Sequence, residues 1–176
     1  MMYEYAPKLK KLREKIWMSV CLFFGVLLYG FGQILPYPIL YQLTSVLLLT
    51  AAVLITVRYL LRDYIYRVTV KEDGLADFTI TEVMGKRKTV VCRISVGEIQ
   101  EITPLLGLSP KGISQKCGKA VLYRYVSQWK PSSPYLLEIF DDEKRYFLEI
   151  SADQGLADLL LDLKKQYLSD KQPPMT

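Results

Sequence analysis

The sequence predicts an α+β architecture: two membrane-spanning helices, then a mostly β domain that ends in an amphipathic helix. Three observations predict it. Ile16 to Val57 form a run of 42 residues without a charged side chain or histidine. From Tyr64 on, apolar residues recur at every second position, as in a half-buried strand. Near the C-terminus they recur at every third or fourth position, as on one face of a helix. The expected organisation is a basic arm (1–15), a transmembrane pair (16–61), a β domain (62–169) and a disordered tail (170–176).

The uncharged run is too long for a single span. A helix rises about 1.5 Å per residue, so 42 residues would extend about 63 Å, twice the hydrocarbon thickness of about 30 Å. Pro36 and Pro38 interrupt the run, because proline removes an amide donor and disfavours a helical residue before it. We therefore expect helices over about 16–35 and 39–61. A cleaved signal peptide is excluded, since it has only one short apolar segment.

The flanking charges predict the orientation of the pair. Residues 1–15 carry a net charge of +3, Arg58, Arg62 and Arg67 follow the second span, and the turn between the spans is uncharged. Cytoplasmic flanks are enriched in Lys and Arg, so both termini are expected in the cytoplasm, on a multi-pass protein of the plasma membrane. The spans contain no ionisable residue, which disfavours a transporter.

About seven short strands are expected in the β domain, because apolar and polar residues alternate between turn signals. We expect them to be antiparallel in sequence order. Residues 107–119 are rich in Gly, Ser and Lys and are expected to form a long mobile loop. The strands are predicted over 64–70, 76–81, 89–94, 120–126, 135–140 and 145–150, with one more short strand within 95–106.

The C-terminal segment predicts a helix that packs on these strands. Its apolar side chains share one helical face: Leu156, Leu159, Leu160, Leu163 and Tyr167. Ser151 and Gln154 have the spacing of a capping box at its start. A few antiparallel strands cannot close both ends of a small barrel, so the helix is expected to plug one end.

Several segments together resemble the bacterial pleckstrin-homology-like domains that follow a transmembrane hairpin. The segments are Tyr64–Leu75, Gly85-Lys-Arg-Lys88, Ile94–Ile102 and the Leu-rich C-terminal helix. The resemblance covers about 64–168 and implies a seven-stranded bent barrel capped by a C-terminal helix. Eukaryotic relatives bind phosphoinositides or proteins, whereas the roles of the bacterial domains are mostly unassigned, and the resemblance supplies no catalytic residue.

The composition excludes several classes of function. The chain has no histidine, so Ser/His/Asp and Cys/His catalytic groups are excluded, and a zinc site would need Cys92 and Cys117 with carboxylates. We expect no metal, no cofactor and, in a reducing compartment, no disulfide. The net charge of +2 from Arg58 onward disfavours nucleic-acid binding.

Charge is distributed unevenly within the β domain. The stretch 86–130 has a net charge of +7, and 131–176 has −4. Two basic groups are candidates for binding phosphate or anionic lipid, although turns also collect solvated charges. They are Lys86, Arg87 and Lys88, and Lys111, Lys116 and Lys119.

The hypothesis favoured by the sequence is a membrane-anchored, non-catalytic binding or scaffolding module. Its partner would be a protein or the anionic membrane surface. An alternative is an accessory subunit of a larger transport or secretion complex, and homo-oligomerisation stays open because small residues in the spans permit close helix packing. An enzyme is less favoured; its candidate carboxylates would be Glu98, Glu101, Asp141, Asp142 and Glu143.

Overall fold

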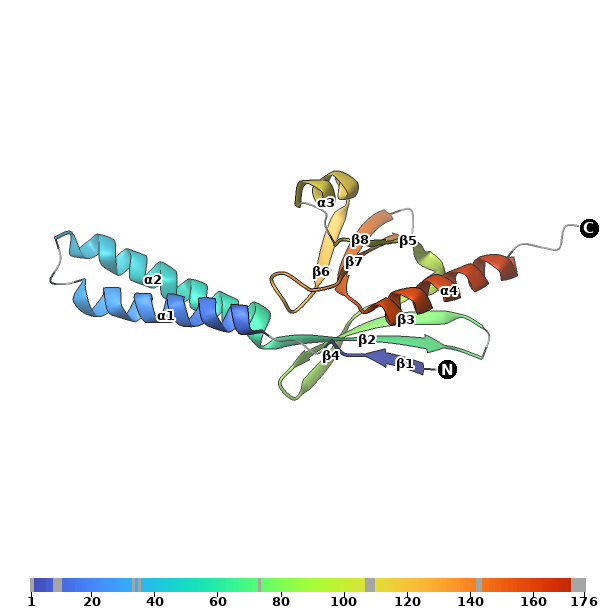
Figure 1. The fold of residues 1–176 in the computed structure, drawn as a ribbon, viewed down its shortest axis with the longest axis horizontal. Helices are drawn as coiled ribbons and strands as arrows, with labels where there is room; N and C mark the ends of the chain where they lie inside the picture. The colour runs from blue at the N-terminus through green and yellow to red at the C-terminus, as the bar shows by residue number, and fades with distance from the viewer. Residues whose placement is uncertain are drawn as a thin grey trace, which may run out of the picture. The chain divides into compact units, whose positions relative to one another are not determined.

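The computed structural model describes residues 2–7, 11–32, 34, 36–72, 74–106, 110–141 and 144–171. The chain divides into two compact units (Figure 1). The hairpin unit consists of Leu9–Asp63 with Ser127–Trp129. The β domain consists of Met1–Lys8, Tyr64–Val126 and Lys130–Thr176.

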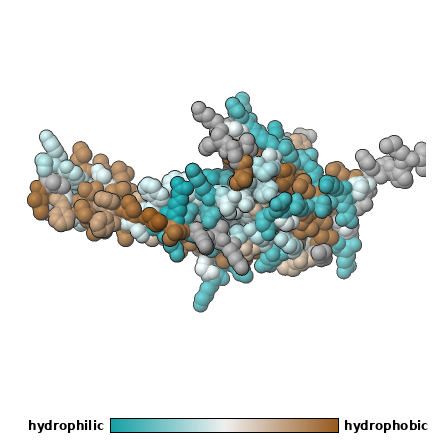
Figure 2. Space-filling model, in the orientation of Figure 1, coloured by the Kyte–Doolittle hydropathy of each residue, from teal (hydrophilic) through white to brown (hydrophobic). Residues whose placement is uncertain are grey.

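The hairpin unit contains two helices that are long and apolar enough to cross a membrane. Helix α1 (Leu12–Phe31) begins and ends closer to the N-terminus than predicted. Helix α2 (Pro38–Ile55) continues as the π-helical turn η1 (Thr56–Leu60). Hydrophobic residues cover most of the visible surface of these helices in Figure 2. The break between them lies at Tyr37, which has a positive φ of 70°, and Pro38 begins α2, as the prolines predicted.

The two helices pack closely because small residues meet. A Cβ atom on Gly25 would lie 2.9 Å from the side chain of Leu49, so a larger residue at 25 would force that side chain to move. The hydroxyl of Ser45 donates a 2.7 Å hydrogen bond to the carbonyl oxygen of Gly25. At the other end, Lys11 Nζ donates to the carbonyl oxygen of Arg62 at 2.8 Å and pairs with Asp63 at 2.7 Å.

Sheet A has the strand order β1-β2-β3-β4, formed by β1 (Met2–Tyr5), β2 (Arg62–Val70), β3 (Ala76–Met84) and β4 (Arg87–Ser95). The description of residues 1–15 as a simple arm is therefore incomplete. Strand β1 pairs antiparallel with β2, with Met2 opposite Thr69 and Tyr5 opposite Tyr66. The rings of Tyr5 and Tyr66 stack 6.3 Å apart. Residues on both sides of the hairpin in sequence thus belong to one sheet.

Sheet B has the order β5-β7-β8-β6, formed by β5 (Ile99–Pro104), β6 (Val121–Tyr125), β7 (Pro134–Asp141) and β8 (Lys144–Ser151). The expectation of strands that are all antiparallel in sequence order is wrong for β6, which lies at the edge and pairs parallel with β8. Its position is explained by packing: Leu122 joins a small cluster with Phe147 of β8.

The predicted mobile loop over 107–119 is also corrected, for the part that the structure describes. Pro110–Cys117 form helix α3, because Ile113 and Cys117 face an apolar cluster. That cluster contains Leu105, Leu136 and Phe147. Helix α3 therefore covers one face of sheet B, and β6 follows from its end.

The main core lies between the two sheets. It contains Tyr66 and Phe78 of sheet A and Leu137 and Leu148 of sheet B, all fully buried. The predicted C-terminal helix is present as α4 (Gln154–Lys171), and Leu156 and Leu160 are both 0 % exposed in the same core.

The expected barrel is not closed in the structure. The strands form two separate four-stranded sheets, and among the described residues no strand pairing joins one sheet to the other. A 3₁₀ turn, η2 (Val96–Glu98), carries the chain from β4 to β5. Helix α4 packs against this turn, where the ring of Tyr167 lies on Gly97.

Candidate binding surfaces

The first predicted basic group lies at the tip of the β3–β4 hairpin, and we call it the basic turn (Lys86, Arg87 and Lys88). Lys86 is in the tight turn, while Arg87 and Lys88 begin β4, opposite Met84 and Val83. Gly85 has a φ of 60°, the left-handed backbone that a turn of this kind needs. All three cations are exposed, and none pairs with a carboxylate among the described residues.

The second predicted basic group lies on and after α3. Lys116 pairs with Glu101 of β5 at 2.8 Å and donates to the hydroxyl of Thr103 at 2.6 Å. The hydrogen bond from Lys116 holds the pKa of the Glu101 carboxyl below its ordinary value, and that from Thr103 adds to it. Lys119 is exposed in the following turn. Lys111 belongs to α3, but its side chain lies outside the described residues.

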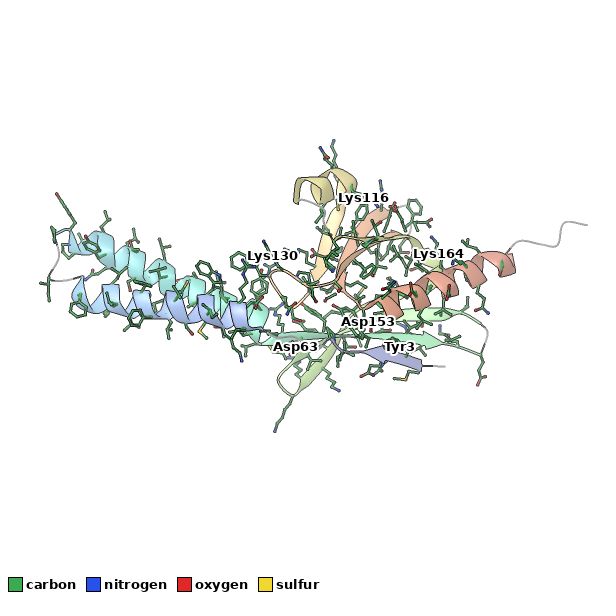
Figure 3. All side chains as sticks on the ribbon, viewed as in Figure 1. Tyr3, Asp63, Lys116, Lys130, Asp153 and Lys164 are labelled. Carbon is green, nitrogen blue, oxygen red and sulfur yellow. The ribbon has the colours of Figure 1, made fainter. Side chains whose placement is uncertain are left out.

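The structure does not bring these two groups together. Helix α3 and the tip of the β3–β4 hairpin lie on opposite sides of the β domain in Figure 1. Lys116 is labelled on the α3 side in Figure 3. The basic turn is therefore the stronger candidate surface, because the charge of Lys116 is already balanced within the fold.

Many other cations of the β domain are balanced in the same way. Arg124 makes a two-point contact with the buried Glu149, at 2.6 and 3.2 Å, and Arg145 pairs with Glu138 at 2.7 Å. Such pairs fix strand neighbours and leave little charge for a ligand. Three consecutive cations that have no carboxylate partner in the described part of the chain therefore set the basic turn apart.

The carboxylates considered for an enzyme have separate structural positions. Glu98 accepts a hydrogen bond from the amide of Ser95 at 3.2 Å and closes a capping box on η2. Glu101 pairs with Lys116, and Asp141 is exposed at the end of β7. Asp142 and Glu143 lie outside the described residues.

The cysteines lie in different environments. Cys92 of β4 packs at the margin of the main core, Cys117 of α3 is buried in the smaller cluster, and both are free thiols. Burial raises the pKa of each thiol, so both are less nucleophilic than an exposed cysteine. In the described part of the chain, no three His, Cys, Asp or Glu side chains gather as a metal site would require.

A cluster in the hairpin unit was not anticipated from the sequence. The buried Glu14 of α1 accepts a 3.0 Å hydrogen bond from the backbone amide of Trp129. The ring of Trp129 stacks on that of Tyr59, with centroids 6.4 Å apart and planes inclined by 12°. The guanidinium carbon of Arg58 lies 5.9 Å from the centre of the Tyr59 ring. We call Glu14, Arg58, Tyr59 and Trp129 the base cluster.

Comparison with known proteins gives no relative on which to model these surfaces. No protein-family model, curated protein or solved structure matches the chain.

Proposed function

We propose that this chain is an integral membrane protein, held by the α1–α2 hairpin, whose β domain is a non-catalytic binding module on the cytoplasmic side. The observation that carries the proposal is the pairing of β1 with β2. These strands immediately precede and follow the hairpin, so both flanks of the hairpin reach one sheet. A pair of spans returns the chain to the side where it began, which agrees with that pairing.

The cytoplasmic assignment is supported by charge. Arg13 and Lys15 at the start of α1 and Arg58 at the end of α2 flank the apolar segment, while the described turn residues 34 and 36–37 carry no charge. Basic flanks favour the cytoplasmic side. The exposed apolar side chains of both helices support insertion into lipid, since water would disfavour so large an apolar surface.

For the β domain, we propose the pleckstrin-homology-like fold. Two stacked sheets and a C-terminal helix packed on their shared core support it. The additional strand β1 and the parallel edge strand β6 with α3 are departures from a simple meander of seven strands. The proposal thus concerns a core of six strands, β2–β5, β7 and β8, and α4.

The ligand that best fits the basic turn is an anionic phospholipid headgroup. Three exposed cations on a projecting hairpin suit a surface of phosphate groups better than a deep pocket. Each basic residue close to an anionic membrane contributes about 1 kcal/mol, and the anchor keeps the domain near that membrane. A protein partner becomes the better explanation if this surface shows no preference for anionic lipid.

The topology is tested by cysteine accessibility in intact cells. The three native cysteines are replaced, and a single cysteine is introduced at Tyr37, between the helices, or at Lys119, an exposed position of the β domain. A membrane-impermeant thiol reagent should label the first variant and not the second. Labelling at 119 in intact cells would place the β domain outside the cytoplasm.

The ligand is tested with the full chain in lipid nanodiscs. An environment-sensitive dye on a single cysteine at Met84, beside the basic turn, should shift its emission in anionic discs and not in neutral ones. Added salt should reverse the shift, because charges are screened over about 8 Å at physiological ionic strength.

Matched variants assign the effect to the basic turn. Replacing Arg87 and Lys88 by Ala should remove the shift, whereas replacing the exposed Lys144 and Lys165 by Ala, with the same loss of charge, should preserve it. Equal emission in anionic and neutral discs would eliminate lipid as the ligand.

A further inference from the structure

We infer that Trp129, which belongs to the connection between β6 and β7, is an interfacial membrane anchor whose ring lies among the phospholipid headgroups where α1 and α2 leave the bilayer. The inference rests on the proposed membrane insertion of the hairpin. It adds a third chain segment to the membrane-contacting surface, one that follows α2 by more than sixty residues in the printed sequence. The partner is the phospholipid surface itself.

The position of the ring follows from its contact with Tyr59. Tyr59 lies in the last turn of the apolar helix Pro38–Leu60, directly after Arg58, the first charged residue beyond the uncharged run. This is the level at which a span passes from hydrocarbon to headgroups, where tyrosine and tryptophan are enriched. Because the Trp129 ring stacks on Tyr59 at 6.4 Å, it occupies the same level.

The exposure of the ring fits a lipid partner. Trp129 is 49 % exposed although its backbone amide is fixed by Glu14, so the fold holds the segment and still leaves about half of the residue accessible to lipid. An indole has an apolar body and one N–H donor, a combination suited to the boundary between acyl chains and water. The nearby Arg58 guanidinium supplies positive charge for a lipid phosphate at that boundary.

Glu14 acts as the positioning residue. Glu14 is only 3 % exposed, and a buried carboxylate is costly unless hydrogen bonds compensate for the lost water. The amide of Trp129 provides such a bond at 3.0 Å. The contact therefore stabilises the carboxylate and fixes the segment that carries the ring.

The chain contains two tryptophans, Trp17 and Trp129, which makes a fluorescence test direct. The Trp17→Phe chain reports on Trp129 alone, and the Trp129→Phe chain reports on Trp17, which lies in α1. Each chain is reconstituted into bilayers whose lipids carry bromine, a contact quencher, either near the glycerol end or near the methyl end of the acyl chains. We expect Trp129 to lose more emission with bromine near the glycerol end.

Trp17 separates failure of this inference from failure of the proposed function. If Trp17 is quenched and Trp129 is not, the hairpin is inserted but Trp129 is not an anchor, and the inference is overturned. Strongest quenching of Trp129 by bromine near the methyl end would also overturn it, since the ring would then be in the hydrocarbon. If neither tryptophan is quenched, membrane insertion itself fails.

Variants at Glu14 test the positioning step in the Trp17→Phe background. Glu14→Gln keeps an acceptor for the Trp129 amide and should preserve the quenching. Glu14→Ala removes the acceptor and should reduce the quenching and shift the Trp129 emission toward that of a ring in water. If quenching of Trp129 is unchanged in Glu14→Ala, Glu14 does not position the ring. As a control, Glu14→Ala in the Trp129→Phe background should leave the quenching of Trp17 unchanged.

Discussion

The hydroxyl of Tyr66 donates a 2.6 Å hydrogen bond to the backbone carbonyl oxygen of Tyr125. Tyr66 belongs to β2 of sheet A, and Tyr125 ends β6 of sheet B. The same hydroxyl accepts a hydrogen bond from the amide of Ser151 at 3.1 Å, at the end of β8. Burial raises the pKa of Tyr66 well above its ordinary value, so the hydroxyl keeps its proton and this link between the sheets persists across the usual pH range.

Replacing Tyr66 by Phe should destabilise the β domain. The ring would still fill the core, but the carbonyl of Tyr125 and the amide of Ser151 would lose a buried partner, at a cost of about 1 to 3 kcal/mol. Denaturant unfolding of the full chain in detergent, followed by the β-sheet signal in circular dichroism, measures the change. Tyr123→Phe is the control because Tyr123 is 47 % exposed. Equal unfolding midpoints for both variants would contradict the prediction.

The architecture could be predicted where burial leaves a local pattern in the sequence. Leu156 and Leu160 repeat at helical spacing because one face of α4 enters the core, and Tyr66 and Val68 alternate with polar residues because one face of β2 does. Each of these repeats lies within a single helix or strand. They therefore need no knowledge of distant parts of the chain.

The features that escaped prediction depend on distant pairing. Strand β1 has only four residues, too few for a clear period, although Tyr3 and Tyr5 do alternate with Met2 and Glu4. Its partner β2 lies beyond the whole hairpin. The parallel pairing of β6 with β8 likewise depends on the cluster under α3, which appears only in the folded chain.

The candidate sites show the same difference between patterns that are local in the sequence and contacts between distant residues. The basic turn was visible because its three cations are consecutive, and its place at a hairpin tip followed from strand alternation. The base cluster was missed because Glu14 reads as one charge in a basic segment. Its partner Trp129 is 115 residues away, and no short-range pattern links the two.

Truncating Leu160 should destabilise the β domain far more than truncating its neighbour. Leu160 is 0 % exposed in the main core, and cutting a buried Leu to Ala costs about 2 to 5 kcal/mol, partly because a cavity remains. Leu161 is 36 % exposed on α4, so Leu161→Ala should change stability much less while altering helix propensity identically. The two unfolding midpoints give the comparison. If both variants unfold like the parent chain, α4 is not docked.

The stability of the β domain should decline on acidification partly through Asp77. Hydrogen bonding from Arg93, at 3.1 Å from its Nε, lowers the pKa of the Asp77 carboxyl below its ordinary 3.8, and Lys71 at 3.2 Å contributes to the same shift. A lowered folded-state pKa stabilises the fold above pH 3.8, and this contribution is lost as pH falls through the folded-state value.

In Asp77→Asn, the free energy of unfolding should therefore vary less with pH in the acid range than in the parent chain. Arg93→Ala, which removes the largest cause, should also flatten the profile. In the Asp77→Asn background, Arg93→Ala should produce no further flattening. Denaturant titrations at several acid pH values measure the slopes, and parallel profiles for parent and Asp77→Asn would argue against a role for this carboxylate.

The ring of Tyr167 packs on Gly97, and this contact fixes α4 against η2. A Cβ atom at Gly97 would lie 2.5 Å from two carbons of the Tyr167 ring, closer than atoms can approach, so Gly97→Ala must displace that ring. The displacement should loosen the last turns of α4 and speed hydrogen exchange of their backbone amides. Tyr167→Ala alone also removes the contact. Because the clash needs both side chains, Gly97→Ala should cost less stability in the Tyr167→Ala background than in the parent chain. Strictly additive costs would mean that the ring does not pack on Gly97 in solution.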